Sequence, residues 1–455
     1  MSHVIAAIST PAGAAGLGVV RLSGDDAVAV AAKLFRPIDA NRPLTALKGY
    51  TAAYGHIYDA DGDVDDCVAL VFRAPHSYTG EDVVELSCHG GRYILQRVLR
   101  ACFAAGARPA AAGEFTRRAF LSGKMDLTGA ESVMDLISAE GKLAAQAALT
   151  AREGGIFRCL TSVKEGLLGV AAQFSAYIDY PDEDIPDLDT SAWSETVENS
   201  IRTVQKLLAT YDTGRILREG VDTAIVGRPN VGKSTLMNLL SGCERSIVTD
   251  IAGTTRDIVE ETVRLGDVTL RLADTAGIRD TADIVENVGV SRARAKMEQA
   301  ALVLAVFDGS EPLAEEDTTL ADALQGRAAI AIINKADKPL AVDKDWIAAH
   351  FPHVVTLSAK EHSGVESLTA AVASLTGIEK LDAAQPILST ERQRQCAADC
   401  LACLREAQDA ITMGLTPDAV SVSVDGAINA LLELTGERAT EAVVKQVFAR
   451  FCVGK

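Results

Sequence analysis

The chain has 455 residues, of which 48% are hydrophobic, and its formal net charge at pH 7 is −18. This length predicts about three domains, and the negative charge argues against broad, nonspecific binding of nucleic acid, so any RNA contact must be local or supplied by a partner. No apolar run approaches the roughly 18 residues of a membrane span, and the first residues lack the pattern of a signal peptide. Nine cysteines, an odd number, indicate reduced thiols. We therefore expect a cytoplasmic protein without a membrane partner.

Residues 1–118 mix short apolar strands with helices. The alternation of apolar and polar residues predicts strands at 16–24, 50–59, 66–75 and 82–91. The stretch 92–106 has the apolar spacing of a helix. Residues 1–118 are therefore predicted to form an α+β domain.

The remaining chain divides into helical and α/β segments. Residues 119–216 show apolar residues three and four positions apart, and residues 379–455 return to the same helical pattern. Between them, residues 217–378 alternate strands with helices, which is typical of a parallel sheet. The two helical segments predict one helical domain with the α/β domain inserted into it. The predicted fold is thus a multidomain α/β protein.

A phosphate-binding motif opens the α/β segment. In residues 222–240, DTAIVGRPNVGKSTLMNLL, an apolar strand is followed by the complete Walker A spacing and then by a helix. The loop N–H groups and the helix N-terminus surround the phosphates, Lys233 reaches the β and γ phosphates, and the Ser234 hydroxyl ligates Mg²⁺. The predicted nucleotide contacts in this loop are Asn230, Val231, Gly232, Lys233, Ser234 and Thr235.

Two switch-like segments follow in order. Asp274 begins the motif DTAG after an apolar strand, so its carboxylate can hold the magnesium shell, and the Gly277 N–H can sense the γ phosphate. The earlier segment TDIAGTTRD, residues 249–257, places Thr255 to complete the Mg²⁺ shell when GTP is bound. The predicted contacts here are Thr249, Thr255, Asp274, Thr275 and Gly277.

Two further motifs select the base. The sequence NKAD follows an apolar strand, and SAK follows another. The Asp337 carboxylate accepts from guanine N1–H and N2–H₂, whereas adenine would leave it unpaired, which can cost about 10⁴ in discrimination. The nucleotide is therefore predicted to be GTP, bound here by Asn334, Lys335, Asp337, Ser358 and Ala359.

One expected catalytic residue is missing. A Ras-like enzyme carries a water-orienting glutamine just after DTAG, but that position is Ile278, which cannot hydrogen-bond to water. No arginine finger is obvious in the chain. Another residue must therefore align the water, and another cation must stabilise the transition state.

These motifs resemble the MnmE (TrmE) family of bacterial and organellar tRNA uridine-modifying GTPases along the whole chain. The resemblance rests on GRPNVGKST, TDIAGTTRD, DTAG, NKAD, SAK, PHSYTGEDVVELSCHGG, GEFTRRAFLSGKMDL and FCVGK. Val453 is a mild departure from the usual Ile or Leu of the terminal signature. In that family the GTPase domains dimerise with K⁺ at the phosphates, in place of an arginine finger. The resemblance implies K⁺ ligands at Asn230 and Thr249 and at the carbonyls of Ile251 and Ala252. It also implies that Glu286 orients the attacking water.

The resemblance also implies a folate site in the N-terminal zone. This zone is similar to the tetrahydrofolate-binding domain of the glycine cleavage T protein, and it would form a constitutive homodimer. The implied folate contacts are Arg21, Glu85, Lys124 and the terminal Lys455. A carboxylate can pair with the pterin edge, and cations suit the glutamate tail of 5-formyl- or 5,10-methylene-tetrahydrofolate.

The terminal segment FCVGK leaves two interpretations open. A helix over 439–451 is expected to run up to Cys452 and to dock the tail, with Gly454 permitting a turn. Cys452 is then either a nucleophile that adds to uridine C6, which requires a thiolate beside a cation, or a small packing residue.

The implied activity is GTP hydrolysis coupled to modification of C5 of the wobble uridine, position 34, of certain tRNAs. A folate one-carbon unit would supply the carbon of an aminomethyl or carboxymethylaminomethyl group, and an FAD-dependent partner, MnmG (GidA), would join in a heterotetramer. The alternative is a ribosome-assembly GTPase switch without modification activity. Such proteins carry a KH domain or a second GTPase domain, and this chain shows no GXXG loop after its GTPase segment.

A cysteine cluster near the C-terminus has the spacing of a radical-SAM site. Cys396, Cys400 and Cys403, however, fall at i, i+4 and i+7 of a helical pattern, on one face. Free cysteine is among the most buried residue types. The sequence therefore favours a buried stripe.

Overall fold

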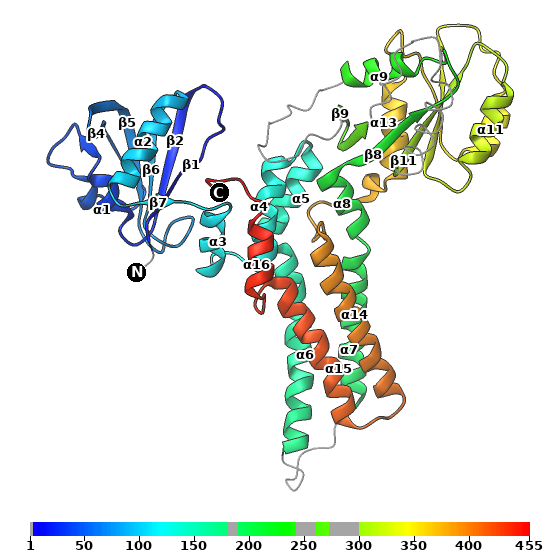
Figure 1. The fold of residues 1–455 in the computed structure, drawn as a ribbon. Helices are drawn as coiled ribbons and strands as arrows, with labels where there is room; N and C mark the ends of the chain where they lie inside the picture. Colours follow the sequence, from blue (N-terminus) through cyan, green and yellow to red (C-terminus); the bar gives the residue numbers. More distant parts are fainter. Residues whose placement is uncertain (1–2, 180–189, 243–260, 273–299) are drawn as a thin grey trace. The chain divides into compact units, whose positions relative to one another are not determined.

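The protein is described by a computed structural model that covers residues 3–179, 190–242, 261–272 and 300–455 (Figure 1). The chain forms two compact units. The N-terminal unit comprises Met1–Met134, Arg152–Arg158 and Ile428–Lys455. The central unit comprises Asp135–Ala151 and Cys159–Ala427.

A seven-stranded sheet with the order β3-β4-β5-β6-β2-β1-β7 organises the N-terminal unit. The pairs are antiparallel except β1 with β7. The strands are β1 (Ile5–Ile8), β2 (Ala15–Ser23), β3 (Phe35–Pro37), β4 (Thr51–Asp59), β5 (Gly62–Phe72), β6 (Val83–Gly90) and β7 (Arg108–Pro109). Helices α1 (Ala27–Ala32) and α2 (Arg92–Ala104) share its core. The four predicted strands and the predicted helix are confirmed.

Residues alternate between the two faces of β2 and β6. Val20 and Leu22 are fully buried, whereas Arg21 between them is partly exposed. Because β2 and β6 pair antiparallel, Arg21 lies directly opposite Glu85. The alternation therefore places both charged residues on the same face of the sheet.

The C-terminal segment packs with helical residues of the N-terminal unit. Helix α16 (Glu441–Phe448) contributes Val444 and Phe448 to a cluster with Leu127 and Ala130 of α4 (Leu127–Ser138). The predicted helix over 439–451 was too long, because α16 ends at Phe448. Phe451 packs into the same cluster as Phe448, with ring centroids 5.2 Å apart, so the chain turns there and leaves the helix.

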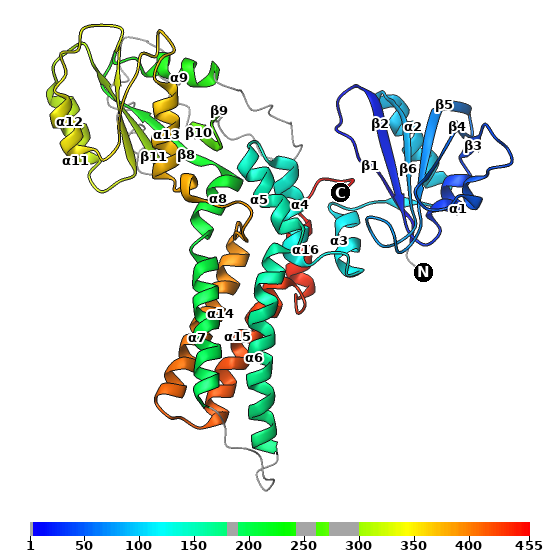
Figure 2. The same cartoon turned by 180° about the vertical axis from the view of Figure 1, so that it is seen from behind.

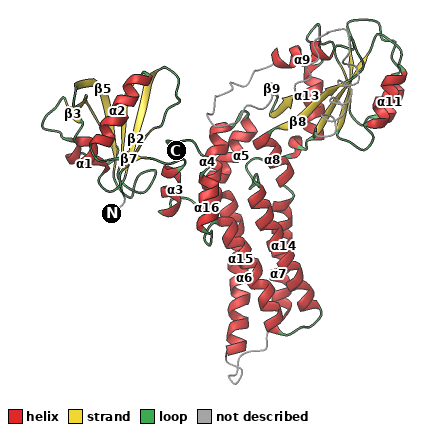
Figure 3. Cartoon of the chain, in the orientation of Figure 1, coloured by secondary structure: helices red, strands yellow, loops and turns green. Residues whose placement is uncertain are grey.

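A six-stranded sheet of order β13-β12-β11-β8-β10-β9 forms the α/β part of the central unit (Figure 3). The strands are β8 (Val221–Val226), β9 (Glu261–Leu265), β10 (Val268–Leu272), β11 (Leu302–Asp308), β12 (Ala329–Asn334) and β13 (Val354–Thr356). The described pairs are parallel except β9 with β10. The predicted parallel sheet is confirmed, with an antiparallel strand at one edge.

The two faces of this sheet belong to two hydrophobic cores. Along β11, Leu302, Leu304 and Val306 pack in one core, and the residues between them pack in the other. The helices of this part are α9 (Lys233–Gly242), α11 (Glu315–Ala323), α12 (Lys344–His350) and α13 (Val365–Leu375). Because both faces are covered, β11 is buried along its whole length, as expected for a parallel sheet.

Helices before and after the α/β segment pack together in the central unit. Helix α7 (Thr190–Leu208) lies beside α14 (Glu391–Thr412) in both views (Figures 1 and 2). The remaining helices are α3 (Glu114–Leu121), α5 (Lys142–Arg152), α6 (Gly155–Asp179), α8 (Tyr211–Glu219) and α15 (Pro417–Thr435).

The fold class, with an α/β domain inserted into a helical domain, is confirmed. The predicted boundaries at 118, 216 and 378 fall inside α3, α8 and a 3₁₀ turn, and they stay predictions.

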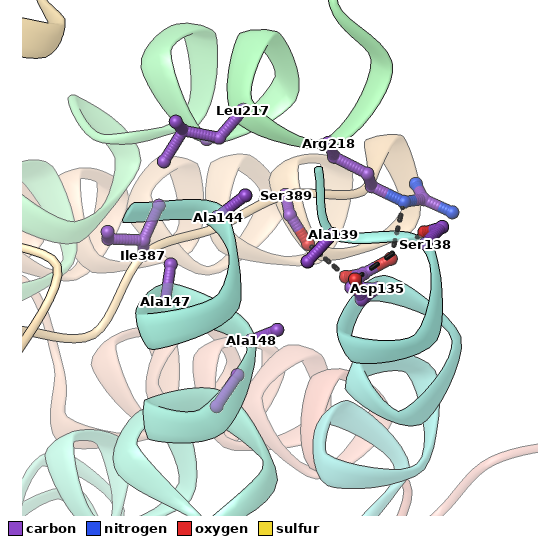
Figure 4. Close-up of a pocket in the computed structure, with 12 residues that line it drawn as sticks. Asp135, Ser138, Ala139, Ala144, Ala147, Ala148, Leu217, Arg218, Ile387 and Ser389 are labelled. Carbon is purple, nitrogen blue, oxygen red and sulfur yellow. Dashed lines mark hydrogen bonds and ion pairs between the residues drawn. The ribbon is translucent and has the colours of Figure 1, made fainter. Parts of the chain in front are cut away.

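Asp135 contacts both segments that connect the α/β domain to the helices, Arg218 before it and Ser389 after it (Figure 4). Arg218 Nε donates to Asp135 Oδ1 at 2.8 Å, and Ser389 Oγ donates to Asp135 Oδ2 at 3.2 Å. These residues line a cavity of about 30 Å³, enough for a water molecule. The Asp135 carboxylate of α4 thus bonds to two segments. One is α8, which leads into β8, and the other is the segment that precedes α14.

The cysteine stripe on α14 is confirmed. Cys396 and Cys400 are buried and Cys403 is partly buried, and burial raises the pKa of the Cys400 thiol to about 12.

Within the part of the chain that the structure describes, no group of three or more His, Cys, Asp or Glu side chains is placed to hold a metal ion. Among the same residues, no helix has the length and apolar character that a membrane crossing requires.

Candidate functional site

The phosphate-binding loop lies between β8 and α9. Gly227 and Gly232 have φ angles of +151° and +99°. A Cβ atom on Gly227 would lie 2.4 Å from the Val306 carbonyl oxygen, and one on Gly232 would lie 2.3 Å from Asn334 Nδ2. Both positions therefore require glycine. Val231 is fully buried and anchors the loop in the core of the α/β domain.

Lys233 begins α9 and reaches back over the loop. Its Nζ donates to the carbonyls of Gly227 at 2.8 Å and Arg228 at 2.9 Å. Burial lowers the pKa of this ammonium group. Ser234 and Thr235 are exposed at the start of the helix, and Asn230 is exposed in the loop with a φ of +63°. The cation and the hydroxyls that phosphate and Mg²⁺ require are thus side by side.

Asn334 joins the base-selecting motif to the phosphate-binding loop. Its Nδ2 donates to the Val231 carbonyl at 2.8 Å, and its Oδ1 accepts from the Ala359 N–H at 3.0 Å. The side chain is buried, with 2% of the residue exposed. The structure therefore brings together three motifs that lie far apart in the sequence.

Asp337 and Lys335 lie at the carboxyl end of β12. Ser358 Oγ donates to Asp337 Oδ1 at 2.6 Å, which lowers the pKa of that carboxyl group. Lys335, with a φ of +65°, forms an ion pair with the buried Asp308 at the end of β11. The Ser358 hydroxyl thus holds one oxygen of the Asp337 carboxylate in place beside the end of β12.

Sequence reasoning missed two supports of this site. One is Asp308, whose carboxylate pairs with Lys335 and so has a lowered pKa despite burial. The other is Arg228, whose Nη2 donates to Glu311 at 2.7 Å and whose Nε lies 3.2 Å from the buried Asp317. The sequence does contain a signal for Asp308, because this acidic residue ends the apolar strand LVLAVFD. The carboxyl ends of neighbouring parallel strands meet at one edge of a sheet, so the residue could have been placed near the NKAD motif.

The remaining predicted nucleotide and ion contacts lie outside the described residues. Among them are the second Mg²⁺ ligand and the water-orienting residue. They are Thr249, Ile251, Ala252, Thr255, Asp274, Thr275, Gly277 and Glu286. Their roles stay predictions.

Arg21 and Glu85 form a partly buried ion pair in the N-terminal unit. Arg21 Nε donates to Glu85 Oε1 at 2.9 Å, and Nη2 lies 2.8 Å from the same oxygen. The guanidinium carbon lies 5.5 Å from the centroid of the Tyr78 ring and 5.6 Å from that of Phe115. Two rings and a carboxylate thus hold the guanidinium in place.

The C-terminal tail reaches this ion pair. Val453 forms an antiparallel bridge with Ala112, and the Phe115 N–H donates to a terminal oxygen of Lys455 at 3.2 Å. Ser9 Oγ donates to the Gly454 carbonyl at 3.1 Å. Gly454 has a φ of +104°, and a Cβ there would lie 2.4 Å from the Ile8 carbonyl oxygen, so only glycine fits. The tail is therefore fixed in place, as expected.

Three of the four predicted folate residues gather at the end of the tail. Burial lowers the pKa of the Lys455 ammonium group, Arg21 lowers it further, and Glu85 opposes the shift. Cys452 is exposed beside this cluster. Lys124 has a different position, because its Nζ donates to the Pro75 carbonyl at 3.1 Å and its side chain lines a separate groove.

Known proteins are similar to this chain over most of its length. A family model described as "MnmE helical domain" matches residues 127–452, more than half of the chain. A second, "GTP-binding protein TrmE N-terminus", matches residues 4–124. Among solved structures, the G domain of the T. maritima FeoB transporter has 24% identity and a TM-score of 0.26 and covers 34% of this chain and 98% of its own.

Curated relatives match along the full length. A protein of Symbiobacterium thermophilum is 43% identical and covers 100% of this chain and 99% of its own. Proteins of Levilactobacillus brevis and Thermoanaerobacter pseudethanolicus are 41% and 38% identical, and each covers 99% of this chain, with 98% and 99% of their own lengths aligned. All three carry the name tRNA modification GTPase MnmE. The chain therefore belongs to the MnmE family.

Proposed function

We propose that the chain hydrolyses GTP and couples this reaction to modification of C5 of the wobble uridine of certain tRNAs. The observation that supports this proposal most directly is the docked tail. It brings the terminal Lys455 and the exposed Cys452 to the Arg21–Glu85 ion pair. A GTPase that acts only as a switch has no use for such a second site in another compact unit.

The GTP site supports hydrolysis by position and charge. Lys233 holds the β and γ phosphates, Ser234 ligates Mg²⁺, and Asp337 selects guanine. Mg²⁺ neutralises charge that develops on the phosphates. Asn230 is exposed at the loop and offers an oxygen ligand to K⁺, which takes the place of an arginine finger. Glu286 orients the attacking water.

The Arg21–Glu85 cluster fits a folate. The Glu85 carboxylate can pair with the amidine-like edge of a pterin, and the cations Arg21 and Lys455 suit its glutamate tail. The Tyr78 ring beside Arg21 is partly exposed and supplies flat apolar surface, whereas the Phe115 ring is fully buried and supports the Arg21 guanidinium from within the core. A 5-formyl- or 5,10-methylene-tetrahydrofolate bound here would supply the one-carbon unit.

Cys452 is the proposed nucleophile toward uridine C6. Its exposure favours this role over packing, because a packing residue would be covered. Addition of its thiolate to C6 would make C5 electron-rich, and C5 would then bond to the one-carbon unit as the bond between that carbon and the folate nitrogen breaks. Loss of the C5 proton and elimination of the thiolate would restore the ring. The ammonium group of Lys455 is the neighbouring cation that such a thiolate requires.

The proposal includes its partners. The chain would act as a homodimer, and it would form a heterotetramer with the FAD-dependent protein MnmG in the cytoplasm. The alternative, a ribosome-assembly switch, requires no folate. Titration of the purified full-length chain with 5-formyl-tetrahydrofolate in a calorimeter separates the two, because saturable binding supports the modification enzyme. Absence of heat at folate concentrations up to the millimolar range would favour the switch.

A further inference from the structure

A large groove in the N-terminal unit has no role in the site described above. Its lining comes from three separate segments of the chain, 117–126, 152–157 and 435–444. Its volume is about 1010 Å³, which is at the upper end of the roughly 300–1,000 Å³ of small-molecule pockets. We call it the α3–α16 groove, because α3 and α16 contribute to its walls.

Three cations line the groove: Arg117, Lys124 and Arg152. Within the described residues none of the three forms an ion pair with a carboxylate, and Arg152 and Lys124 are exposed. Arg117 is half-buried, and its Nε is buried with no hydrogen-bond partner among the described residues. The positive charge of Arg117 is thus not neutralised by a carboxylate among the described residues, and the partly exposed side chain presents it to the groove.

Apolar side chains lie among these cations. Phe120 and Phe157 line the groove and are partly exposed. Leu121 is 64% exposed in the same lining. Cations interleaved with aromatic rings are typical of sites for single-stranded nucleic acid, where bases stack on rings and phosphates contact cations.

Four carboxylates also line the groove, and they limit what it can bind. Asp126 accepts from the Gly129 N–H at the start of α4. Glu441 lies in the first turn of α16, and Glu437 accepts from Thr435 Oγ1. The fourth is Glu153. A double-stranded backbone along the whole groove would meet these charges, whereas a short loop that contacts only the cationic wall avoids them.

The groove adjoins the C-terminal tail. Arg152, at the end of α5, lines the groove and acts electrostatically on the Lys455 ammonium group. Cys452 is exposed on the same tail. A base held in the groove would therefore lie near the residues that carry the chemistry.

We propose that the α3–α16 groove binds a single-stranded RNA loop, with Arg117, Lys124 and Arg152 on its phosphates and an unstacked pyrimidine among Phe120 and Phe157. This inference rests on the proposed function, because it names the substrate segment that the tail site would modify. An enzyme that reacts with a base must take that base out of its stack. The groove resolves the conflict between an RNA substrate and the net charge of −18, since the RNA contact is local.

The test compares two variants with the same change in net charge. Arg152→Glu alters the groove, and Arg100→Glu alters an exposed arginine on α2. Binding of a fluorescent tRNA with a wobble uridine to the full-length chain is measured at several KCl concentrations. For Arg152→Glu we expect a Kd at least about tenfold higher. We also expect the plot of log binding constant against log KCl concentration to be shallower by about one unit of slope. Arg100→Glu should bind like the unmodified chain, and Arg152→Lys should retain most of the slope.

Titration with 5-formyl-tetrahydrofolate identifies the alternative occupant. Unchanged folate binding in Arg152→Glu, together with weaker tRNA binding, supports the RNA groove. Loss of folate binding with normal tRNA binding would assign the groove to the folate tail and overturn the inference. Equal tRNA binding by both glutamate variants would also overturn it while leaving the proposed function intact. If the unmodified chain bound no tRNA even with its FAD-dependent partner, the proposed function would fail as well.

Discussion

The side chain of Asn334 donates to the carbonyl of Val231 and so connects the base-selecting motif to the phosphate-binding loop. Replacement by alanine leaves this carbonyl and the Ala359 N–H without a partner in a buried place. A lost partner for a buried polar group costs about 1–3 kcal/mol. We expect Asn334→Ala to weaken GDP binding at least about tenfold and to lower the unfolding temperature. Fluorescent nucleotide titration and calorimetry measure both effects, and Asn199→Ala, at an exposed position of α7, is the control. Wild-type affinity in Asn334→Ala would contradict this role.

Asp337 should determine the preference for guanine. Asp337→Asn replaces an acceptor with a donor, so GTP should bind more weakly, by a factor that can reach about 10⁴. Xanthosine triphosphate, which offers an acceptor at the exchanged position, should bind better than it does to the unmodified chain. Competition between the two nucleotides provides the measurement, and a variant that still prefers GTP would show that another residue reads the base.

GTP hydrolysis should be faster in K⁺ than in Na⁺ at equal ionic strength. The proposed ion replaces an arginine finger, which contributes up to about 10³–10⁵ in rate. Asn230→Lys places an ammonium group at the same loop, so its remaining activity should no longer depend on K⁺. Phosphate release in the two salts tests both statements. Equal rates for the unmodified chain would remove the basis for the potassium site.

Glu286→Ala should lower kcat with little change in GTP affinity. The residue is proposed to act on the attacking water alone, so its loss affects the transition state and not the ground state. Single-turnover hydrolysis and nucleotide titration separate the two quantities. A variant with weak GTP binding and normal turnover would point to a structural role in the switch segment.

The C-terminal tail should be required for tRNA modification and not for GTP hydrolysis. Cys452→Ser removes the thiolate, and deletion of the last four residues also removes Lys455 and the contacts of Gly454. Both variants should hydrolyse GTP, and neither should modify tRNA when nucleosides are analysed by mass spectrometry. Normal modification by Cys452→Ser would exclude the nucleophile, and the deletion would then report on folate binding by Lys455.

Local motifs made much of the GTP site predictable. The Walker A loop and the NKAD and SAK motifs each carry their chemistry in a few adjacent residues, so Lys233 and Asp337 could be named as candidates without a structure. Their supports could not, because Asp308 and Arg228 act across neighbouring strands and loops, where pairing depends on sheet order.

The N-terminal site was less predictable from residues alone. Arg21 and Glu85 lie 64 residues apart, and their pairing depends on the register of β2 with β6. The family resemblance named both residues as folate contacts but did not predict that they pair. The α3–α16 groove is assembled from three distant segments and carries no motif. The end of α16 was misplaced because helical periodicity continues into Phe451, whereas packing of that ring requires the chain to turn.

The contacts between Gly454 and the first strand have a consequence for the order of folding. Ser9 donates to a carbonyl that lies 445 positions later in the sequence, and the Ile8 carbonyl packs against the same glycine. Contacts between such distant segments form only after a large loss of chain entropy. We therefore expect the cluster around Arg21 to be completed late in folding, after the sheet that carries Arg21 and Glu85 has formed.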